Sequence, residues 1–181
     1  EHNRDVVVII DEAYTDFSGE SALSLTKEYD NVLIIQTFSK SRSMAGMRIG
    51  YAMGNPELIK AMNDVRFSYN SYPMTRLSVA LGVAAIEDED YFQKTTKQII
   101  ETREWTKEKL KELGFTFGDS KTNFIFAKHE TADAEDIFAK LREKHIFVRH
   151  FTSERIRNYL RISIGTREEM ETFIGELRNI L

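Results

Sequence analysis

Short runs of consecutive apolar residues near the start of the chain predict buried β-strands. Residues 6–10 and 32–36 are apolar at nearly every position, which is typical of strands covered on both faces in an α/β sheet. Residues 48–54 are a third candidate strand. A helix is predicted next, over residues 55–65, because Asn55 is a good N-cap and a proline follows at the first helical position. We therefore expect an α/β layer up to about residue 67.

The second part of the chain combines a helix-rich stretch with alternating strands and helices. Residues 75–113 carry apolar residues at helical spacing, interrupted by an acidic segment at 87–90, which predicts one bent helix or two. Gly114 is the expected C-cap. Beyond it the pattern reads β, β, α, β, β, α, and Thr166 and Glu169 are spaced as a capping box before the last helix. We expect a division at residue 70, with 1–70 in an α/β layer and 71–181 forming a long helix and a small α+β domain.

Composition restricts the class of protein. The chain has 181 residues, of which 41% are hydrophobic, enough for a real core. It has no cysteine, which fits a reducing compartment and makes the cytoplasm the expected location. The net charge of −4 argues against non-specific binding of nucleic acid, and no apolar run is long enough to cross a membrane. The four histidines show no metal-ligand spacing, so no metal site is expected.

Acidic residues at the end of the first predicted strand suggest a ligand site. The stretch "VVVIIDEAY" places Asp11, Glu12 and Tyr14 where the strand ends, and strand ends border the crevice of an open α/β sheet. At this point metal, nucleotide and cofactor sites all remain open. Because side chains alternate along a strand, Glu12 faces the other side and is expected to be structural.

The stretch "TFSKSRSMAGMRIGY" after the second predicted strand supplies a basic, hydroxyl-rich cluster. Thr37, Ser39 and Arg48 have the chemistry of a phosphate receptor, and Arg42 either assists them or is solvated. Lys40 lies among them, and neighbouring positive charge favours the uncharged amine that attacks a carbonyl. A site for a phosphate beside an amine that can attack an aldehyde suggests that the ligand is pyridoxal phosphate. Asp11 would then pair with its protonated ring nitrogen, while Tyr14 would bond its phenolic oxygen.

These motifs carry a resemblance to a known family. "DEAYTDF", "TFSKSRSMAGMRIGY" and "NYLRISIGTREE" resemble the aminotransferases of pyridoxal-phosphate fold type I, most closely those specific for histidinol phosphate, over essentially the whole chain. The resemblance implies that Lys40 forms the Schiff base with the cofactor and carries the proton. It implies further that Arg161 holds an acidic group of the substrate and that Arg149 helps hold the substrate phosphate.

The resemblance also implies partners and a missing part. The expected substrates are an amino donor, histidinol phosphate, and the 2-oxo acid 2-oxoglutarate, in histidine biosynthesis, and the expected assembly is a homodimer. Family members are longer, and their amino-terminal half supplies a glycine-containing phosphate loop and an aromatic ring that stacks on the cofactor. The chain opens without methionine, directly before an apolar strand. We therefore expect a carboxy-terminal fragment that is inactive by itself.

Parts of the sequence also fit other classes of protein. "VVVIIDE" also fits the Walker-B strand of an ATPase, although the phosphate-loop motif is not in this sequence. Thr37 and Lys40 also match the spacing of a penicillin-recognising enzyme, without its companion motifs. Within the same fold, the alternative is another aminotransferase or a carbon–sulfur lyase. Outside catalysis, the alternative is a regulatory or interaction module.

Overall fold

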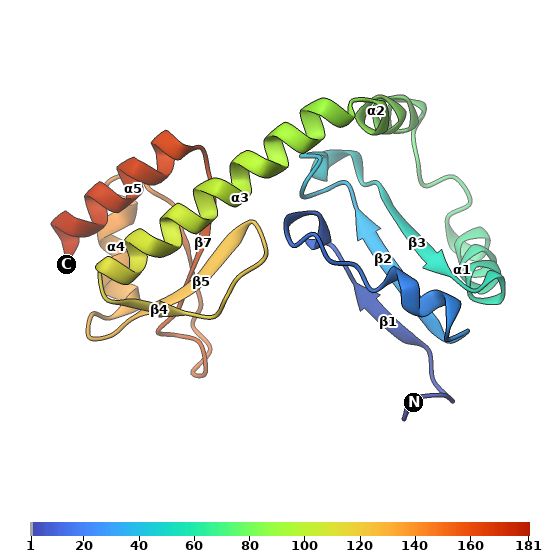
Figure 1. The fold of residues 1–181 in the computed structure, drawn as a ribbon, viewed down its shortest axis with the longest axis horizontal. Coiled ribbons are helices and arrows are strands. Elements are labelled where there is room, and N and C mark those ends of the chain that lie inside the picture. The colour runs from blue at the N-terminus through green and yellow to red at the C-terminus, as the bar shows by residue number, and fades with distance from the viewer. Residues whose placement is uncertain (1) are drawn as a thin grey trace. The chain divides into compact units, whose positions relative to one another are not determined.

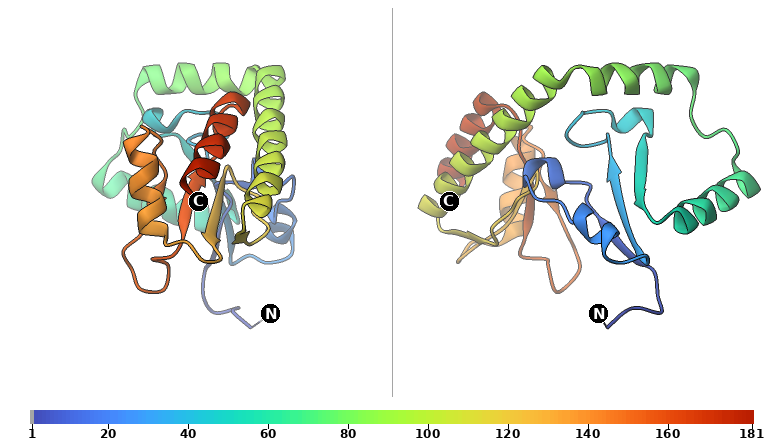
Figure 2. Two further views of the ribbon diagram at one scale, coloured as in Figure 1. Left: turned by 90° about the vertical axis from the view of Figure 1, so that its left-hand side faces the viewer. Right: turned by 45° about the vertical axis from the view of Figure 1, so that its right-hand side comes forward.

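The computed structural model describes residues 2–181, which divide into two compact units with the division at Lys94 and Thr95. Figures 1 and 2 show the elements of both units. Each unit has its own β-sheet, and α3 (Glu89–Glu112) belongs in part to both. The predicted division at residue 70 differs from this one. Residues 71–94 stay with the first unit because they pack on it: the Ser78 hydroxyl donates to the Met47 carbonyl at 3.2 Å.

The first unit is built on a three-stranded sheet in the order β1-β2-β3. β1 and β2 are parallel, whereas β3 is antiparallel to β2. All three predicted strands are present. The elements, in chain order, are β1 (Val8–Asp11), the 3-10 helices η1 (Thr15–Phe17) and η2 (Leu23–Lys27), β2 (Val32–Thr37), η3 (Ala45–Met47), β3 (Gly50–Gly54), α1 (Pro56–Tyr69) and α2 (Arg76–Glu87).

Helix starts in this unit follow the sequence signals, but the helix faces do not. Asn55 caps α1 by accepting the Glu57 amide at 2.8 Å, with Pro56 at the first helical position. The helix-rich stretch forms two helices, α2 and α3. The buried residues of α2 are Ser78 and Gly82, whereas Leu77 and Leu81, which belong to its apolar spacing, are exposed. A Cβ on Gly82 would lie 3.0 Å from Ile49 Cδ1. The small residues on this face of α2 therefore allow the helix to approach Ile49 closely.

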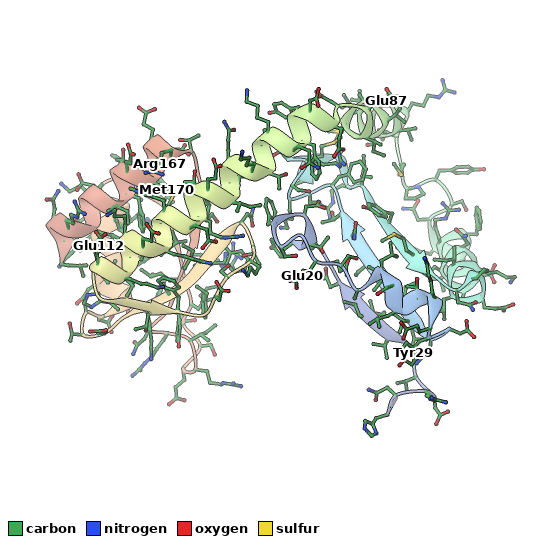
Figure 3. All side chains as sticks on the ribbon, in the orientation of Figure 1. Glu20, Tyr29, Glu87, Glu112, Arg167 and Met170 are labelled. Carbon is green, nitrogen blue, oxygen red and sulfur yellow. The ribbon has the colours of Figure 1, made fainter. Side chains whose placement is uncertain are left out.

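Many large apolar side chains of the first unit are exposed. Figure 3 shows the described side chains on the ribbon. α1 has no buried residue. The core is formed mainly by β2 and the segments that flank it. Large apolar side chains that stand exposed in this unit include Val6, Val7, Ile9, Met62, Val65, Phe67, Tyr69, Tyr72, Leu77, Val79, Leu81, Val83 and Ile86.

The second unit is a small α+β domain with the predicted β, β, α, β, β, α order. Its antiparallel sheet has the strand order β4-β5-β7-β6. Gly114, at φ +79°, ends the preceding helix in the left-handed region that glycine tolerates. The elements are β4 (Phe115–Phe117), β5 (Phe124–His129), α4 (Ala134–Glu143), β6 (Arg149–His150), β7 (Leu160–Ser163) and α5 (Arg167–Ile180).

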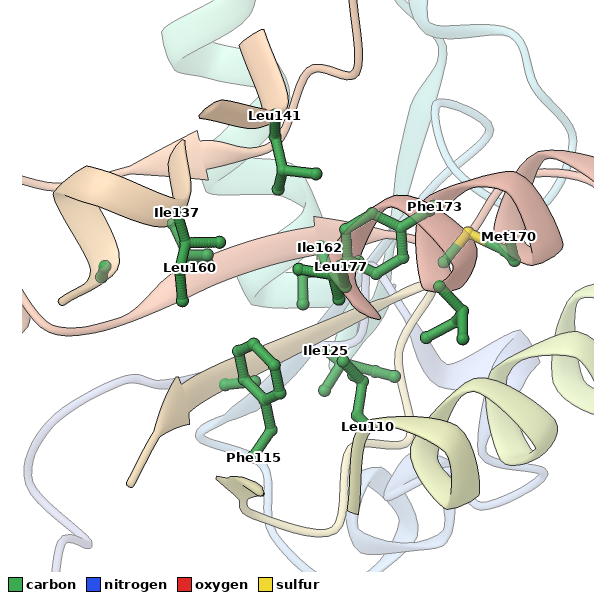
Figure 4. Packing of buried hydrophobic residues seen from close by; sticks show 13 residues of the cluster. Leu110, Phe115, Ile125, Ile137, Leu141, Leu160, Ile162, Met170, Phe173 and Leu177 are labelled. Carbon is green, nitrogen blue, oxygen red and sulfur yellow. The ribbon is translucent and has the colours of Figure 1, made fainter. Parts of the chain in front are cut away.

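Three helices cover one face of this sheet. Leu110 of α3, Leu141 of α4 and Leu177 of α5 are fully buried against Ile125 of β5 and neighbouring strand residues (Figure 4). The predicted capping box starts α5: the Thr166 hydroxyl accepts the Glu169 amide, and the Glu169 carboxylate accepts the Thr166 amide at 2.7 Å. The opposite face of the sheet carries the alternate residues of β5 and β7, which include Arg161. Among the described residues no helix is long and apolar enough to cross a bilayer.

Candidate active site

Strand pairing brings two of the predicted site segments to one edge of the first sheet. In the parallel β1–β2 pair, Asp11 is the Cα partner of Ile35, and β2 ends two residues later at Thr37. Thr37 in turn pairs with Gly50, two residues after Arg48. The side chains of all three predicted positions therefore start from the carboxyl edge of β1 and β2, where open α/β sheets bind ligands.

Thr37 and Ser39 form a pair of linked hydroxyls at this edge. The Thr37 hydroxyl lies 2.9 Å from the Ser39 hydroxyl and accepts the Ser39 amide at 3.1 Å. Both residues are half-buried. This local turn holds two hydroxyl groups together, as required for directional contacts to an anion.

Arg48 is exposed and has an unusual backbone. It lies in the left-handed region, at φ 57° and ψ 43°, directly after η3. Its Nη1 donates to the Ala45 carbonyl at 2.9 Å. Because a guanidinium has five N–H donors, this bond leaves capacity for an anion.

Lys40 lies next to Tyr14. Its Nζ is 5.4 Å from the centroid of the Tyr14 ring, and both side chains are half-buried. Lys40 also begins a turn, since its carbonyl accepts the Ser43 amide at 3.1 Å.

Asp11 and Glu12 have different environments although they are adjacent. Asp11 is exposed, and its Oδ1 accepts the Ala13 amide at 3.0 Å. Glu12 is buried and accepts from the Ser21 hydroxyl, the Ala22 amide and Gln36 Nε2. Burial raises the pKa of Glu12, but these hydrogen bonds outweigh it and hold the pKa below its ordinary value. Glu12 therefore remains ionised and fixes the segment after β1, which agrees with a structural role.

Gln36 and Tyr51 extend this network beyond the predicted residues. They are Cα partners in the β2–β3 pair, and the Tyr51 hydroxyl donates to Gln36 Oε1. Burial, together with the charge of Asp16, raises the pKa of Tyr51. A polar glutamine in an apolar strand is the only sequence feature that points to such a role.

The Arg42 guanidinium contacts two aromatic rings and α2. Its guanidinium lies 4.0 Å from the Phe92 ring centroid and 5.5 Å from that of Phe38, and Nη1 donates to the Ala85 carbonyl. These contacts make it a tether between its own turn and α2.

Arg149 and Arg161 form a cross-strand pair in the second unit. They are Cα partners in the antiparallel β6–β7 ladder, so both side chains start from the same face of the sheet. Arg149 is exposed and lies over Phe151, whereas Arg161 lies over Phe124 at 5.5 Å. The Arg161 Nε is buried without a hydrogen-bond partner. A buried cationic donor of this kind is suited to an anionic ligand.

The donor set in the first unit fits pyridoxal phosphate. Two hydroxyls and a guanidinium match a phosphate, the Lys40 amine matches an aldehyde, and an exposed carboxylate at the end of β1 matches a protonated ring nitrogen. Within residues 2–181 no group of three or more His, Asp or Glu side chains could hold a metal ion.

Comparisons with known proteins point to the same chemistry. The family model described as aminotransferase class I and II matches residues 2–177. The chain is 53% identical, over 181 residues, to the histidinol-phosphate aminotransferases of Clostridium botulinum strain Okra and of Brachyspira hyodysenteriae, covering 51% of each and nearly all of this chain. It thus spans about half the length of these relatives.

A solved structure agrees with this result. The crystal structure of histidinol-phosphate aminotransferase from Sinorhizobium meliloti in complex with pyridoxal-5'-phosphate superposes with a TM-score of 0.83 at 28% identity. The superposition covers 96% of this chain and 48% of that protein.

Proposed function

The chain belongs to the class I and II aminotransferase family, and from that premise we propose that it works as the carboxy-terminal half of a pyridoxal-phosphate-dependent aminotransferase. The substrates are histidinol phosphate and 2-oxoglutarate. The observation that carries the proposal is the position of Lys40, beside Tyr14 and one residue after the linked hydroxyls at the end of β2. Asp11, at the end of the adjacent parallel strand, completes the set.

Each residue has a distinct role in this proposal. Bound pyridoxal phosphate supplies an aldehyde that accepts amino groups and a ring that withdraws electrons from the adjacent carbon. Thr37, Ser39 and Arg48 hold its phosphate, and Asp11 keeps its ring nitrogen protonated. Tyr14 forms a hydrogen bond with the phenolic oxygen of the cofactor. Lys40 would hold the cofactor covalently until the amino donor displaces it, and the freed amine would then move the proton from the substrate's alpha carbon to the former aldehyde carbon of the cofactor.

The two arginines of the second unit set the choice of substrate. Arg149 holds the phosphate of histidinol phosphate, and Arg161 holds an acidic group of either substrate. The buried, unpartnered Nε of Arg161 supports this role. Specificity for histidinol phosphate is supported by the 53% identity to two histidinol-phosphate aminotransferases.

We propose further that the whole protein is a cytoplasmic homodimer of histidine biosynthesis. The resemblance to the family supports the dimer, and the absence of cysteine fits a reducing compartment. Gel filtration with light scattering of the full-length protein measures the assembly.

Replacement of Lys40 tests the proposed function. In the full-length protein that carries this chain, Lys40→Ala is expected to abolish the visible absorption of lysine-bound cofactor and nearly all transamination. The matched control is Lys27→Ala, which removes an exposed lysine of the same unit. An unchanged spectrum in Lys40→Ala would refute the assignment. Release of ammonia and a 2-oxo acid from a sulfur-containing amino acid would instead favour a carbon–sulfur lyase.

A further inference from the structure

The turn that carries Lys40 is closed by its own backbone. The Ser43 amide donates to the Lys40 carbonyl at 3.1 Å, which makes Ser41 and Arg42 the two central residues of a four-residue turn. The Met44 amide donates to the Phe38 carbonyl at 3.0 Å and closes a wider loop around the first. The position of the Lys40 side chain therefore depends on what holds this turn in place.

Both central residues of the turn are tied to other segments. The Ser41 hydroxyl donates to the Asp16 carboxylate, and Ser41 is buried with 4% of its surface exposed. Arg42 packs on Phe92 and donates to the Ala85 carbonyl. One tether thus leads to η1 and the other to the end of α2.

The tether to Asp16 runs beside the contact between Lys40 and Tyr14. Asp16 follows Tyr14 by two residues, and Ser41 follows Lys40 by one, so the Ser41–Asp16 bond joins the same two segments that bring Lys40 Nζ over the Tyr14 ring. A hydrogen bond from a buried hydroxyl to a carboxylate is stronger than one between neutral groups.

We propose that Ser41 and Asp16 are positioning residues for Lys40. Their hydrogen bond holds the turn of residues 40–43 against η1 and so fixes the amine of Lys40 relative to Tyr14. Neither residue touches the reacting atoms; both act through Lys40. This inference rests on the proposed role of Lys40 as the cofactor-binding lysine.

Hydrogen exchange tests the structural part without any cofactor. In the cofactor-free full-length protein, Ser41→Ala and Asp16→Ala are each expected to speed exchange of the Met44 amide about tenfold, the effect of losing one such hydrogen bond. Asp16→Asn keeps an acceptor oxygen and should remain within about twofold of the parent. Ser24→Ala, an exposed serine of the same unit, is the matched control.

Kinetics and visible circular dichroism test the positioning role. With pyridoxal phosphate bound, Ser41→Ala and Asp16→Ala should keep full cofactor content, lose visible dichroism, and lower kcat about tenfold with little change in KM. The double variant should be no worse than either single variant, because one bond is lost in each. Asp16→Asn should restore kcat and dichroism.

Three results would overturn the inference: unchanged exchange in both alanine variants, faster exchange with unchanged kcat, or additive losses in the double variant. Failure of the proposed function gives a different result, because the parent protein itself would then take up no pyridoxal phosphate. In that case the positioning role fails too, while the exchange rates still decide whether Ser41 and Asp16 hold the turn.

Discussion

Asp11 ends β1 with an exposed carboxylate, next to the buried and strongly hydrogen-bonded Glu12. In the full-length protein, Asp11→Asn should leave cofactor binding nearly intact and slow proton transfer at the substrate's alpha carbon far more, because an amide stabilises a protonated ring nitrogen less well than a carboxylate does. Single-turnover absorbance measurements give both quantities. Equal single-turnover rates in variant and parent would contradict the role of Asp11.

Arg149 and Arg161 are Cα partners, but they are expected to respond differently to substitution. Arg149→Ala should lower kcat/KM for histidinol phosphate by roughly 10- to 150-fold, since a charge-assisted contact contributes about 1.5–3 kcal/mol, and should affect a donor without phosphate much less. Arg161→Ala should also impair the reaction with glutamate. Exposed Arg142 of α4 provides the control, as Arg142→Ala. If Arg149→Ala lost kcat/KM equally with both donors, the proposed specificity for histidinol phosphate would be wrong and only a generic aminotransferase would be supported.

At the scale of elements, two helical glycines give a matched pair. Gly175 in α5 has nothing within 4 Å of a built Cβ, whereas Gly82 in α2 faces Ile49 at 3.0 Å. Gly175→Ala should therefore raise the free energy of unfolding by about 0.5–1 kcal/mol, through reduced backbone entropy of the unfolded chain. Gly82→Leu should lower it by about 1–3 kcal/mol by overpacking.

Urea unfolding followed by circular dichroism measures both changes. Each unit is monitored separately by hydrogen exchange, since the two glycines belong to different units. A stabilising Gly82→Leu would show that α2 does not need its small face.

Local signals predicted the elements better than their packing. Asn55 and the Thr166–Glu169 capping box mark helix starts because a cap is a contact between residues a few positions apart. The buried face of α2 does not follow the apolar spacing, because that spacing marks the apolar positions, whereas the contact with Ile49 requires Gly82. Small residues in a sequence do not indicate a buried helix face until the segment that packs against them is known.

The same distinction applies to the candidate site. Asp11 and Thr37 end their strands and Lys40 follows soon after β2, and strand ends are visible in the apolar pattern. The bonds of Ser41 to Asp16 and of Tyr51 to Gln36 join residues 25 and 15 positions apart, so they depend on tertiary structure. The sequence therefore predicts which chemical groups could form a site, but it does not predict the hydrogen bonds that hold those groups in place.

At the scale of the whole molecule, the first unit leaves many large apolar side chains exposed to solvent. Val7, Val65 and Leu77 are each more than half exposed, from three different elements or their flanks. Chains with such surfaces associate. We predict that the 181-residue chain by itself self-associates, has no aminotransferase activity and carries no stoichiometric pyridoxal phosphate. Light scattering and absorbance of the purified chain test this, and an isolated monomer with cofactor bonded to Lys40 would disprove it.

The left-handed backbone of Arg48 implies a conflict between two kinds of selection. A side chain at φ 57° costs roughly 1 kcal/mol relative to glycine. Selection for thermal tolerance alone would therefore favour glycine at this position in every generation. If Arg48 holds the cofactor phosphate as proposed, selection on that contact would oppose the change to glycine, whereas a lineage that lost the activity would be free to drift towards glycine.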